Sequence, residues 1–380
     1  MLSHKPTILF ICTDWYEFGG SSASLIDMIQ ALGDRITPIV LLNAEGCVAD
    51  KMRQMGLRIL VHPFFYLWDK PKPLKTTLHH PTRSTLYRHL TLNRRCANMV
   101  ISSLQGTTID IVHSNSSITT VGATLAKKLR AKHIWHIREF IDLDFRLDVY
   151  GGRKQLQRTI ERHSDARICV SSAVAHHWHL QSERTHVLWD AVVNTSHGTP
   201  TILDKEPYFL FCAANITSAK GAEEAVEAFC LSGLTNKGYR LKMAGHVSDE
   251  YRNHLLALAQ KTQDDTHIEF CGFCKPEEIF PRATAFIMSS PCEAMGRVTV
   301  QAMWYGCPVV ARNSGGTPDF VRHNETGYLY ETPTECAQWL RQVAFHPTLD
   351  IIHKAQDFTA AHFSIADYGD KIMNIYNSLL

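Results

Sequence analysis

The segment from Ser289 to Thr317 constrains the fold of this 380-residue chain more than any other. It follows an apolar run at 285–288 and leads into a second one at 308–311, and both runs are typical of buried parallel strands. Between them, residues 297–305 favour a helix and contain no Gly or Pro, and Gly306 is placed to end that helix. The sequence therefore predicts a strand, a loop, a helix and a strand, the unit from which doubly wound α/β sheets are built.

Polar side chains gather at the start of this predicted helix. Glu293 lies in the loop, and Arg297 and Gln301 are one helical turn apart, so both can point from one face of the helix towards its N-terminus. In a parallel sheet the loop after a strand faces the ligand crevice, and a helix N-terminus presents free N–H groups to an anion. We expect these three groups to converge on a ligand. The alternative is a solvated loop carboxylate and a surface cation.

Composition bounds the class of protein. A chain of 380 residues with 45% hydrophobic and 20% charged residues is typical of a globular protein of two domains. No apolar run reaches the roughly 18 to 20 residues of a membrane span, and the N-terminus lacks the apolar core of a signal peptide, so we expect a cytoplasmic protein. The 11 cysteines are scattered, and several lie in strand-like runs, as Cys12, Cys169, Cys212 and Cys271 do. This favours buried thiols over a disulfide framework.

Charge is distributed unevenly. Residues 1–200 hold 24 Lys and Arg against 16 Asp and Glu, and the remainder holds 15 against 21. Residues 70–95 carry seven basic residues, no acidic one, and interleaved leucines. This pattern fits an anionic membrane surface, a phosphorylated acceptor or a solvated loop and helix. No nucleic-acid-binding motif accompanies the charge, so we do not expect a nucleic-acid partner.

Strand-like and helix-like runs alternate along the chain. Strands are predicted at 7–13, 38–42, 58–62, 109–114, 133–137, 168–171 and 186–189, with a loop at 14–22 and helices at 24–32 and 117–129. After a polar linker at 194–207, strands are predicted at 208–214, 241–244, 268–271, 285–288, 309–311 and 328–330, and a helix at 365–380. We therefore predict an α/β protein with a domain at 1–195, a second at 206–363 and a C-terminal helix at 364–380.

Residues 285–330 resemble the signature of retaining family 4 glycosyltransferases of the GT-B fold. Glu293 takes the first glutamate position of that signature, Gln301 the second, Gly306 to Val309 the G-x-P-V strand and Gly315-Gly316 the following turn. The resemblance implies two Rossmann-like domains facing across a cleft, with the C-terminal helix returning to the first. Gln301 is a departure: glutamine can still hydrogen-bond a ribose but lacks the charge. Weaker donor binding, another nucleotide preference and an inactive relative all stay open.

The resemblance also implies donor-binding residues. In the loop from Asn215 to Gly221, Lys220 matches the family's Lys-Gly and would bind the donor diphosphate. Gly19 and Gly20 match a glycine turn beside the same diphosphate. The helix N-terminus at Gly296 would complete this site, Glu293 would hold hydroxyls of the donor sugar, and Gln301 would hold the ribose. The second cation is our own inference: we assign it to Arg297.

Residues 135–140, WHIREF, resemble a motif at the end of a strand in many bacterial members of the family. His136 matches the active-site histidine of the first domain, close to the transferred sugar. The catalytic residues implied are thus His136 and Glu293. Arg138 and Glu139 would serve the site or brace it.

The predicted function is transfer of a hexosyl group from a nucleotide-sugar donor to a hydroxyl of a glycan or lipid-linked acceptor. The resemblance implies retention of the anomeric configuration, no metal and no cofactor, and a role in polysaccharide or glycolipid assembly at the inner face of the membrane. A sugar-nucleotide 2-epimerase of the same fold is an alternative, as is a weakened or non-catalytic nucleotide-sugar-binding relative.

Overall fold

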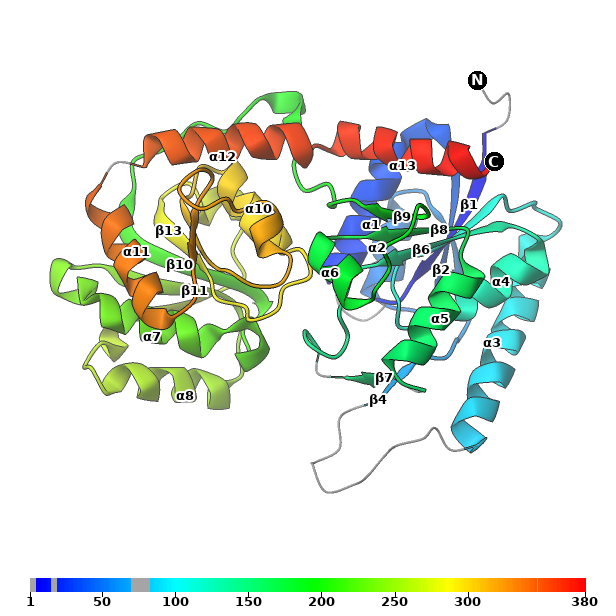
Figure 1. Cartoon of the computed structure of the whole chain (residues 1–380), viewed down its shortest axis with the longest axis horizontal. Coiled ribbons are helices and arrows are strands. Elements are labelled where there is room, and N and C mark those ends of the chain that lie inside the picture. Colours follow the sequence, from blue (N-terminus) through cyan, green and yellow to red (C-terminus); the bar gives the residue numbers. More distant parts are fainter. Residues whose placement is uncertain (1–4, 15–18, 70–82, 146, 150, 347) are drawn as a thin grey trace. The chain divides into compact units, whose positions relative to one another are not determined.

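The computed structural model describes residues 5–14, 19–69, 83–145, 147–149, 151–346 and 348–380, and the chain divides into two compact domains (Figure 1). The first domain comprises Met1–Ala191 and Ile365–Leu380, and the second comprises Val192–Ser364. The chain thus passes between the domains twice, at 191–192 and at 364–365. The predicted linker at 194–207 lies within the second domain, and its residues lead into the first strand there.

The first domain contains a parallel sheet of seven strands in the order β3-β2-β1-β5-β6-β8-β9. The strands are β1 (Thr7–Cys12), β2 (Thr37–Leu42), β3 (Arg58–Val61), β5 (Ile111–Ser114), β6 (Lys132–Ile137), β8 (Ala166–Cys169) and β9 (Thr185–Val187). A short antiparallel pair, β4 (Trp68–Asp69) and β7 (Asp148–Val149), stands apart from this sheet. Strands buried on both faces read as continuous apolar runs, which is why the sequence marks them well.

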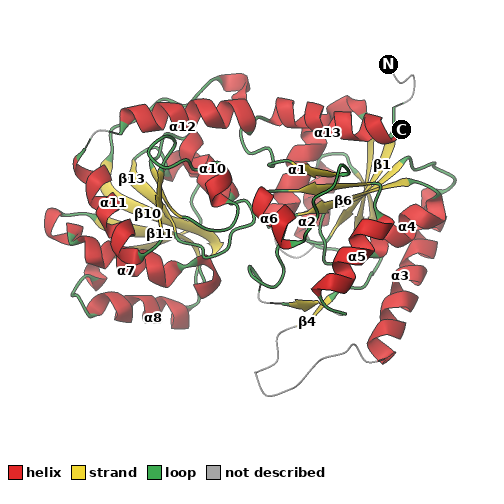
Figure 2. Ribbon diagram, in the orientation of Figure 1, coloured by secondary structure: helices red, strands yellow, loops and turns green. Residues whose placement is uncertain are grey.

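Helices cover both faces of this sheet (Figure 2). Alternate residues of β1 point into different cores. Ile8 and Phe10 share a core with α1 (Gly20–Leu32), α2 (Cys47–Gln54) and α13 (Ile365–Leu379). Leu9 and Ile11 share a core with α3 (Arg83–Leu104) and α4 (Val121–Leu129). The remaining helices are α5 (Arg153–His163) and α6 (Ser172–His177). The period of two along the strand therefore builds a three-layer α/β/α domain.

The C-terminal helix α13 completes the first domain by packing against α1 (Figure 1). Its buried side chains include Tyr368, Ile372, Ile375 and Tyr376, in the same core as β1 and α1. Gly369 permits the approach, because a Cβ there would lie 2.4 Å from the Ala31 carbonyl oxygen of α1. The last 16 residues are thus part of the core of the first domain.

The second domain contains a parallel six-stranded sheet in the order β12-β11-β10-β13-β14-β15. Its strands are β10 (Glu206–Asn215), β11 (Arg240–His246), β12 (Ile268–Gly272), β13 (Ala283–Met288), β14 (Val309–Arg312) and β15 (Tyr328–Tyr330). Its helices are α7 (Ala222–Ser232), α8 (Asp249–Gln260), α9 (Pro276–Ile279), α10 (Arg297–Trp304), α11 (Pro333–Phe345) and α12 (Leu349–His362). Helices α7, α8 and α11 share one core with the sheet, and α10 packs against α12.

In each sheet, successive strands of the chain are added first at one side and then at the other. The switch falls between β1 and β5 in the first sheet and between β10 and β13 in the second. Ligands of open α/β sheets bind at the carboxyl ends of the strands beside such a switch point. The loops that follow these four strands begin at residues 13, 115, 216 and 289. They contain the predicted site residues Gly19, Lys220, Glu293 and Gly296.

Three expectations from the sequence need correction. The predicted loop at 14–22 is too long, since α1 begins at Gly20, and the helix predicted from 117 begins at Val121. All 11 cysteines are free thiols, but Cys271 is exposed at the end of an edge strand rather than buried. Within the described residues no helix is both long and apolar enough to cross a membrane.

Candidate functional site

Lys220 and Glu293 meet at the switch point of the second sheet. Lys220 ends the turn that follows β10, and Glu293 lies in the loop that follows β13, the strand next to β10. The Lys220 ammonium Nζ lies 2.9 Å from Glu293 Oε2, and the two side chains are 38% and 19% exposed. The structure thus brings together two residues that are 73 positions apart and that the sequence assigns to one ligand.

Close backbone contacts hold this pair in place. A Cβ on Gly221 (φ +74°) would lie 2.0 Å from the Ser289 carbonyl oxygen, so only glycine allows the two loops to touch. Gly315 (φ +58°) packs against the Glu293 backbone in the same way, with its Cβ position 2.4 Å from the Glu293 carbonyl oxygen. The Gly316 N–H then donates to that oxygen at 2.8 Å. The carboxylate of Glu293 is therefore presented from a rigid support.

The N-terminus of α10 lies beside Glu293. Gly296 precedes the helix in the left-handed conformation (φ +82°), and the first turn has neither an acidic residue nor a side-chain cap. The Thr299 N–H donates to the Gly296 carbonyl oxygen at 3.0 Å, and no acidic side chain in the first turn offsets the positive end of the helix dipole. Arg297, the first helical residue, is half-buried, and Asn215 at the end of β10 is exposed.

Gln301 does not share the place of Lys220 and Glu293. It lines a cavity of about 470 Å³ with Asn194, His197, Trp304 and Tyr305. The direct partner of Glu293 is the ammonium of Lys220, and the convergence of Glu293, Arg297 and Gln301 on one ligand stays a prediction. A larger cavity of about 930 Å³ lies at the amino edge of the sheet, opposite these residues.

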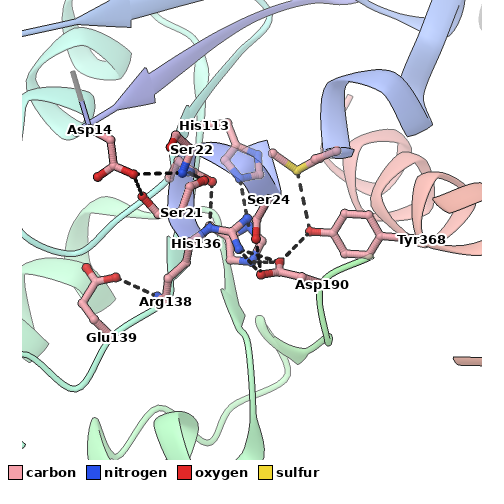
Figure 3. Close-up of polar contacts among 12 residues, drawn as sticks. Asp14, Ser21, Ser22, Ser24, His113, His136, Arg138, Glu139, Asp190 and Tyr368 are labelled. Carbon is pink, nitrogen blue, oxygen red and sulfur yellow. Dashed lines mark hydrogen bonds and ion pairs between the residues drawn. The ribbon is translucent and has the colours of Figure 1, made fainter. Parts of the chain in front are cut away.

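In the first domain, Gly19 and Gly20 form the start of α1 rather than a free turn. Gly19 is the N-cap residue and Gly20 the first helical residue. The Asp14 carboxylate, at the end of β1, accepts hydrogen bonds from the Ser22 N–H at 2.9 Å and the Ser21 hydroxyl at 2.6 Å. In this structure a carboxylate therefore lies where the resemblance places a donor phosphate (Figure 3).

Arg138 and Asp190 form a buried ion pair next to this helix (Figure 3). Arg138 Nη1 lies 2.5 Å from each Asp190 carboxylate oxygen, and the side chains are 4% and 6% exposed. Arg138 Nε donates to Asn115 Oδ1 at 2.8 Å, while Asp190 accepts from Ser24 of α1 at 2.8 Å and from Tyr368 of α13 at 3.3 Å. Because nearly every donor and acceptor has a partner, the pair can be tolerated in the interior.

His136 lies behind this pair, and none of its surface is exposed. It occupies the penultimate position of β6, on the sheet face that α1 and α13 cover. Its Nδ1 lies 3.2 Å from His113 Nε2 and 3.3 Å from Arg138 Nη2. Burial, with the Arg138 charge and His113 as smaller causes, holds the pKa of His136 well below its usual value. The imidazole is therefore neutral at pH 7 and positioned in the core, not presented at the surface.

Glu139 braces a loop. Its Oε1 accepts from the Ser116 hydroxyl and the Ser117 N–H, each at 2.5 Å, and from the Ser117 hydroxyl at 2.8 Å. Burial raises the pKa of Glu139, and the bonds from the two serines oppose that rise. Of the two roles predicted for Glu139, the structure favours the bracing one.

Sequence reasoning missed the partners of Arg138. The sequence did not identify Asp190, Asn115 or Tyr368 as partners of Arg138. A signal was present for Asp190, because an acidic residue within an apolar segment is seldom buried without a cation. Among the described residues no three His, Cys, Asp or Glu side chains are grouped closely enough to hold a metal ion.

Comparison with known proteins finds relatives for part of this chain. Residues 197–345 match the family model for glycosyl transferases group 1. Spore coat protein SA of Bacillus subtilis is 31% identical over 97 residues, which cover 24% of this chain and 25% of that protein. The GDP-mannose-dependent alpha-(1-6)-phosphatidylinositol monomannoside mannosyltransferase of Mycobacterium tuberculosis is 29% identical over 130 residues, 32% of this chain and 33% of that protein. The chain thus matches a quarter to a third of the length of these relatives.

Solved structures match nearly the whole chain. Anabaena Alr3699/HepE in complex with UDP and glucose has a TM-score of 0.77 at 17% identity, over 98% of this chain and 100% of that one. A glycosyltransferase from Rickettsia africae has a TM-score of 0.76 at 19% identity, over 99% and 98%. The fold is therefore GT-B, with two Rossmann-like domains, and the second domain matches group 1 glycosyltransferases in sequence.

Proposed function

We propose that the protein is a retaining glycosyltransferase that transfers a hexosyl group from a nucleotide diphosphate donor to an acceptor hydroxyl. The observation that carries the proposal is the Lys220–Glu293 pair beside the N-terminus of α10. A cation and the positive end of a helix dipole suit a diphosphate, and a rigidly held carboxylate suits sugar hydroxyls. UDP-glucose is the first donor to test, since the similar Alr3699/HepE structures contain UDP and UDP-glucose.

The proposed chemistry follows from charge. As the glycosidic bond breaks, negative charge grows on the leaving diphosphate, and preorganised cations and N–H groups stabilise it. Lys220, Arg297 and the N-terminus of α10 supply these groups in place of a metal ion. Glu293 orients the sugar through its hydroxyls, and a leaving phosphate oxygen takes the proton of the incoming hydroxyl, so no protein nucleophile is required and the configuration is retained.

The residues of the first domain have a supporting role in this proposal. His136 and Arg138 are buried, so they position the carboxyl edge of the sheet rather than contact the sugar. Gly19 and Gly20 form the start of α1, and a phosphate would have to displace the Asp14 carboxylate to reach it. Because His136 is buried, this proposal gives it a positioning role in place of the catalytic role that the resemblance implies.

Thermal shift against UDP, UDP-glucose, GDP and ADP, without added metal, tests the donor site. A nucleotide at 100 times its Kd should stabilise the native state by about 2.7 kcal/mol. Lys220→Ala should abolish the shift. Lys275→Ala is the matched control, because Lys275 also pairs with a glutamate, at 3.3 Å from Glu278, but is 70% exposed and is not a predicted site residue. Loss of the shift in both variants, or in neither, would contradict the assignment.

Transfer itself is tested by donor cleavage and by the anomeric configuration of the product. Gln301 favours one competing function, a binding protein without turnover, because a neutral amide replaces the expected charge. A nucleotide shift without cleavage that Gln301→Glu converts to cleavage would support that function. Cleavage by the wild-type protein would exclude it.

Peripheral contact with an anionic membrane, at the cytoplasmic face, would bring the enzyme to a lipid-linked acceptor in polysaccharide or glycolipid assembly. Residues 70–82 of the predicted basic segment lie outside the described residues. The remainder begins α3, where Tyr87 and Leu90 are 69% and 46% exposed beside Arg88, Arg94 and Arg95. Co-sedimentation with vesicles containing anionic lipid, but not with zwitterionic vesicles, is the expected result, and loss of binding in Arg94→Glu/Arg95→Glu would assign it to α3.

A further inference from the structure

The ring of His136 is held by donors on one side only. Its Nδ1 receives Arg138 Nη2 at 3.3 Å and His113 Nε2 at 3.2 Å. A guanidinium nitrogen carries hydrogens and no lone pair, so it can only donate. His136 Nδ1 must therefore be the acceptor, and the single ring proton of a neutral His136 must be on Nε2.

The neighbouring hydrogen bonds agree with this assignment. The Tyr376 hydroxyl lies 2.8 Å from His113 Nδ1. If Tyr376 donates to that nitrogen, the proton of His113 is on Nε2, from which it donates to His136. Each bond in the chain from Tyr376 through His113 to His136 then has one donor and one acceptor. This arrangement requires a neutral His113, and burial holds the pKa of His113 well below its usual value.

The charged groups that face His136 are Arg138 from the end of β6 and Asp190 from the segment after β9. Asp190 Oδ1 lies 3.9 Å from His136 Nε2, which is too long for a hydrogen bond. Both of its oxygens already accept from Arg138. His136 Nε2 is buried and has no hydrogen-bond partner among the described residues. The Asp190 carboxylate thus pairs with the guanidinium and does not accept from His136 Nε2.

We infer that Arg138 is a positioning residue that fixes His136 as the neutral imidazole with its proton on Nε2, and that Asp190 is the counter-charge that makes this possible. Without Arg138, the Asp190 carboxylate would be left beside His136 Nε2 with no cation. His136 would then gain a proton and replace Arg138 as the partner of Asp190. The role of this arrangement in turnover rests on the proposed function, but the protonation state itself does not.

Nitrogen-15 spectra of the histidine rings test the inference on the full-length protein. The ring signal of His136 is identified by its absence in His136→Gln. In the wild-type protein we expect the pattern of a neutral ring with the proton on Nε2, unchanged from about pH 8 to about pH 5, the range in which an ordinary histidine gains its proton. A proton on Nδ1, or a titration of His136 within that range, would overturn the inference without any variant.

Two variants separate charge from packing. In Arg138→Met we expect His136 to become a cation that titrates within or above this range. In Arg138→Lys, which keeps the positive charge, we expect it to stay neutral. Adding Asp190→Asn to Arg138→Met removes the orphaned carboxylate, and His136 should be neutral again. This double variant also serves if Arg138→Met does not fold, because it leaves no unpaired buried charge. An unchanged His136 in a folded Arg138→Met would refute the role of Arg138.

The catalytic consequence has its own readout. If donor cleavage is observed, the cleavage rate of Arg138→Met should fall at low pH and recover at high pH as His136 loses its proton, whereas Arg138→Lys should keep the wild-type pH profile. A flat profile for Arg138→Met, in a protein whose spectra show a charged His136, would mean that the protonation state does not matter for turnover. If the wild-type protein cleaves no donor, the proposed function fails, and the spectra still decide the inference.

Discussion

Acid should destabilise the first domain because it buries three neutral histidines. His113, His133 and His136 all have pKa values lowered by burial, and that of His133 falls to about 4. His133 is 2% exposed, and its two ring nitrogens lie 2.5 Å from the His163 carbonyl oxygen and 2.9 Å from the Ser114 hydroxyl. Because a carbonyl oxygen only accepts, Nδ1–H donates to His163 and Nε2 accepts from the Ser114 hydroxyl. A second ring proton, on Nε2, would remove that acceptor.

The sign and size of the effect follow from linkage. An unfolded histidine binds a proton below its ordinary pKa of 6.5, whereas folded His133 does not until about pH 4, so stability falls as the pH drops through this window. Each bound proton is worth about 1.4 kcal/mol per pH unit, which gives about 2 kcal/mol for His133 between pH 6.5 and pH 5. Total stabilities are of the order of 5 to 15 kcal/mol, so a single histidine is measurable.

The assay compares wild-type protein with His133→Gln in urea between pH 7.5 and pH 5. Pulsed hydrogen exchange of β5 and β6 peptides reports on the first domain alone, and β10 and β13 peptides serve as the internal reference. Between pH 7.5 and pH 5, the unfolding free energy of His133→Gln should fall by about 2 kcal/mol less than that of the wild-type protein, whatever its stability at pH 7.5. His176→Gln is the control, because His176 is exposed. Parallel pH curves for wild-type protein and His133→Gln would refute the reasoning.

Three further changes test the packing and the site. Gly221→Ala should lower the stability of the second domain in urea by more than the control Gly238→Ala. Both positions have φ near +80°, so an alanine at either should cost about 1 to 2 kcal/mol of stability. Only at Gly221 would the added Cβ also collide with a carbonyl oxygen. Equal losses would mean that the loops move apart freely. Glu293→Gln should keep the nucleotide-induced thermal shift and slow transfer about 10- to 100-fold, the value of a hydrogen bond to a charged group, and an unchanged rate would remove Glu293 from the mechanism. Tyr376→Phe should lower the stability of the first domain by about 1 kcal/mol, measured by urea unfolding, because His113 loses its partner, and no loss would show that this bond contributes nothing.

The strands could be predicted because they are buried on both faces. A run such as Thr7–Cys12 has no polar interruption, and its predicted bounds, 7–13, differ from the observed ones by one residue. The start of α1 could not be predicted in the same way. Gly20 to Ser22 have poor helix propensity, and the Asp14 carboxylate that accepts from the Ser22 N–H and the Ser21 hydroxyl belongs to the preceding loop.

Contacts between distant residues were the least predictable part of the site. Lys220 and Glu293 could be assigned to one ligand by resemblance, but their direct pairing depends on the parallel register of β10 and β13. Arg138 and Asp190 are 52 positions apart, and nothing in the local sequence of either residue indicates the other. The burial of His136 was missed for a related reason, since α13, which covers it, comes more than 200 residues later in the chain.

The two ion pairs differ in exposure, and this difference indicates which of them can serve a charged ligand. Breaking a buried pair such as Arg138–Asp190 leaves an uncompensated charge in the interior and costs about 3 to 5 kcal/mol, so a ligand would have to supply that energy before gaining anything. The Lys220–Glu293 pair is partly exposed, and pairs of that kind contribute about 1 kcal/mol or less. Lys220 can therefore exchange its carboxylate for a diphosphate at little cost. Electrostatic reorganisation on donor binding should accordingly be confined to the second domain, while the polar cluster of the first domain keeps the same partners throughout the reaction.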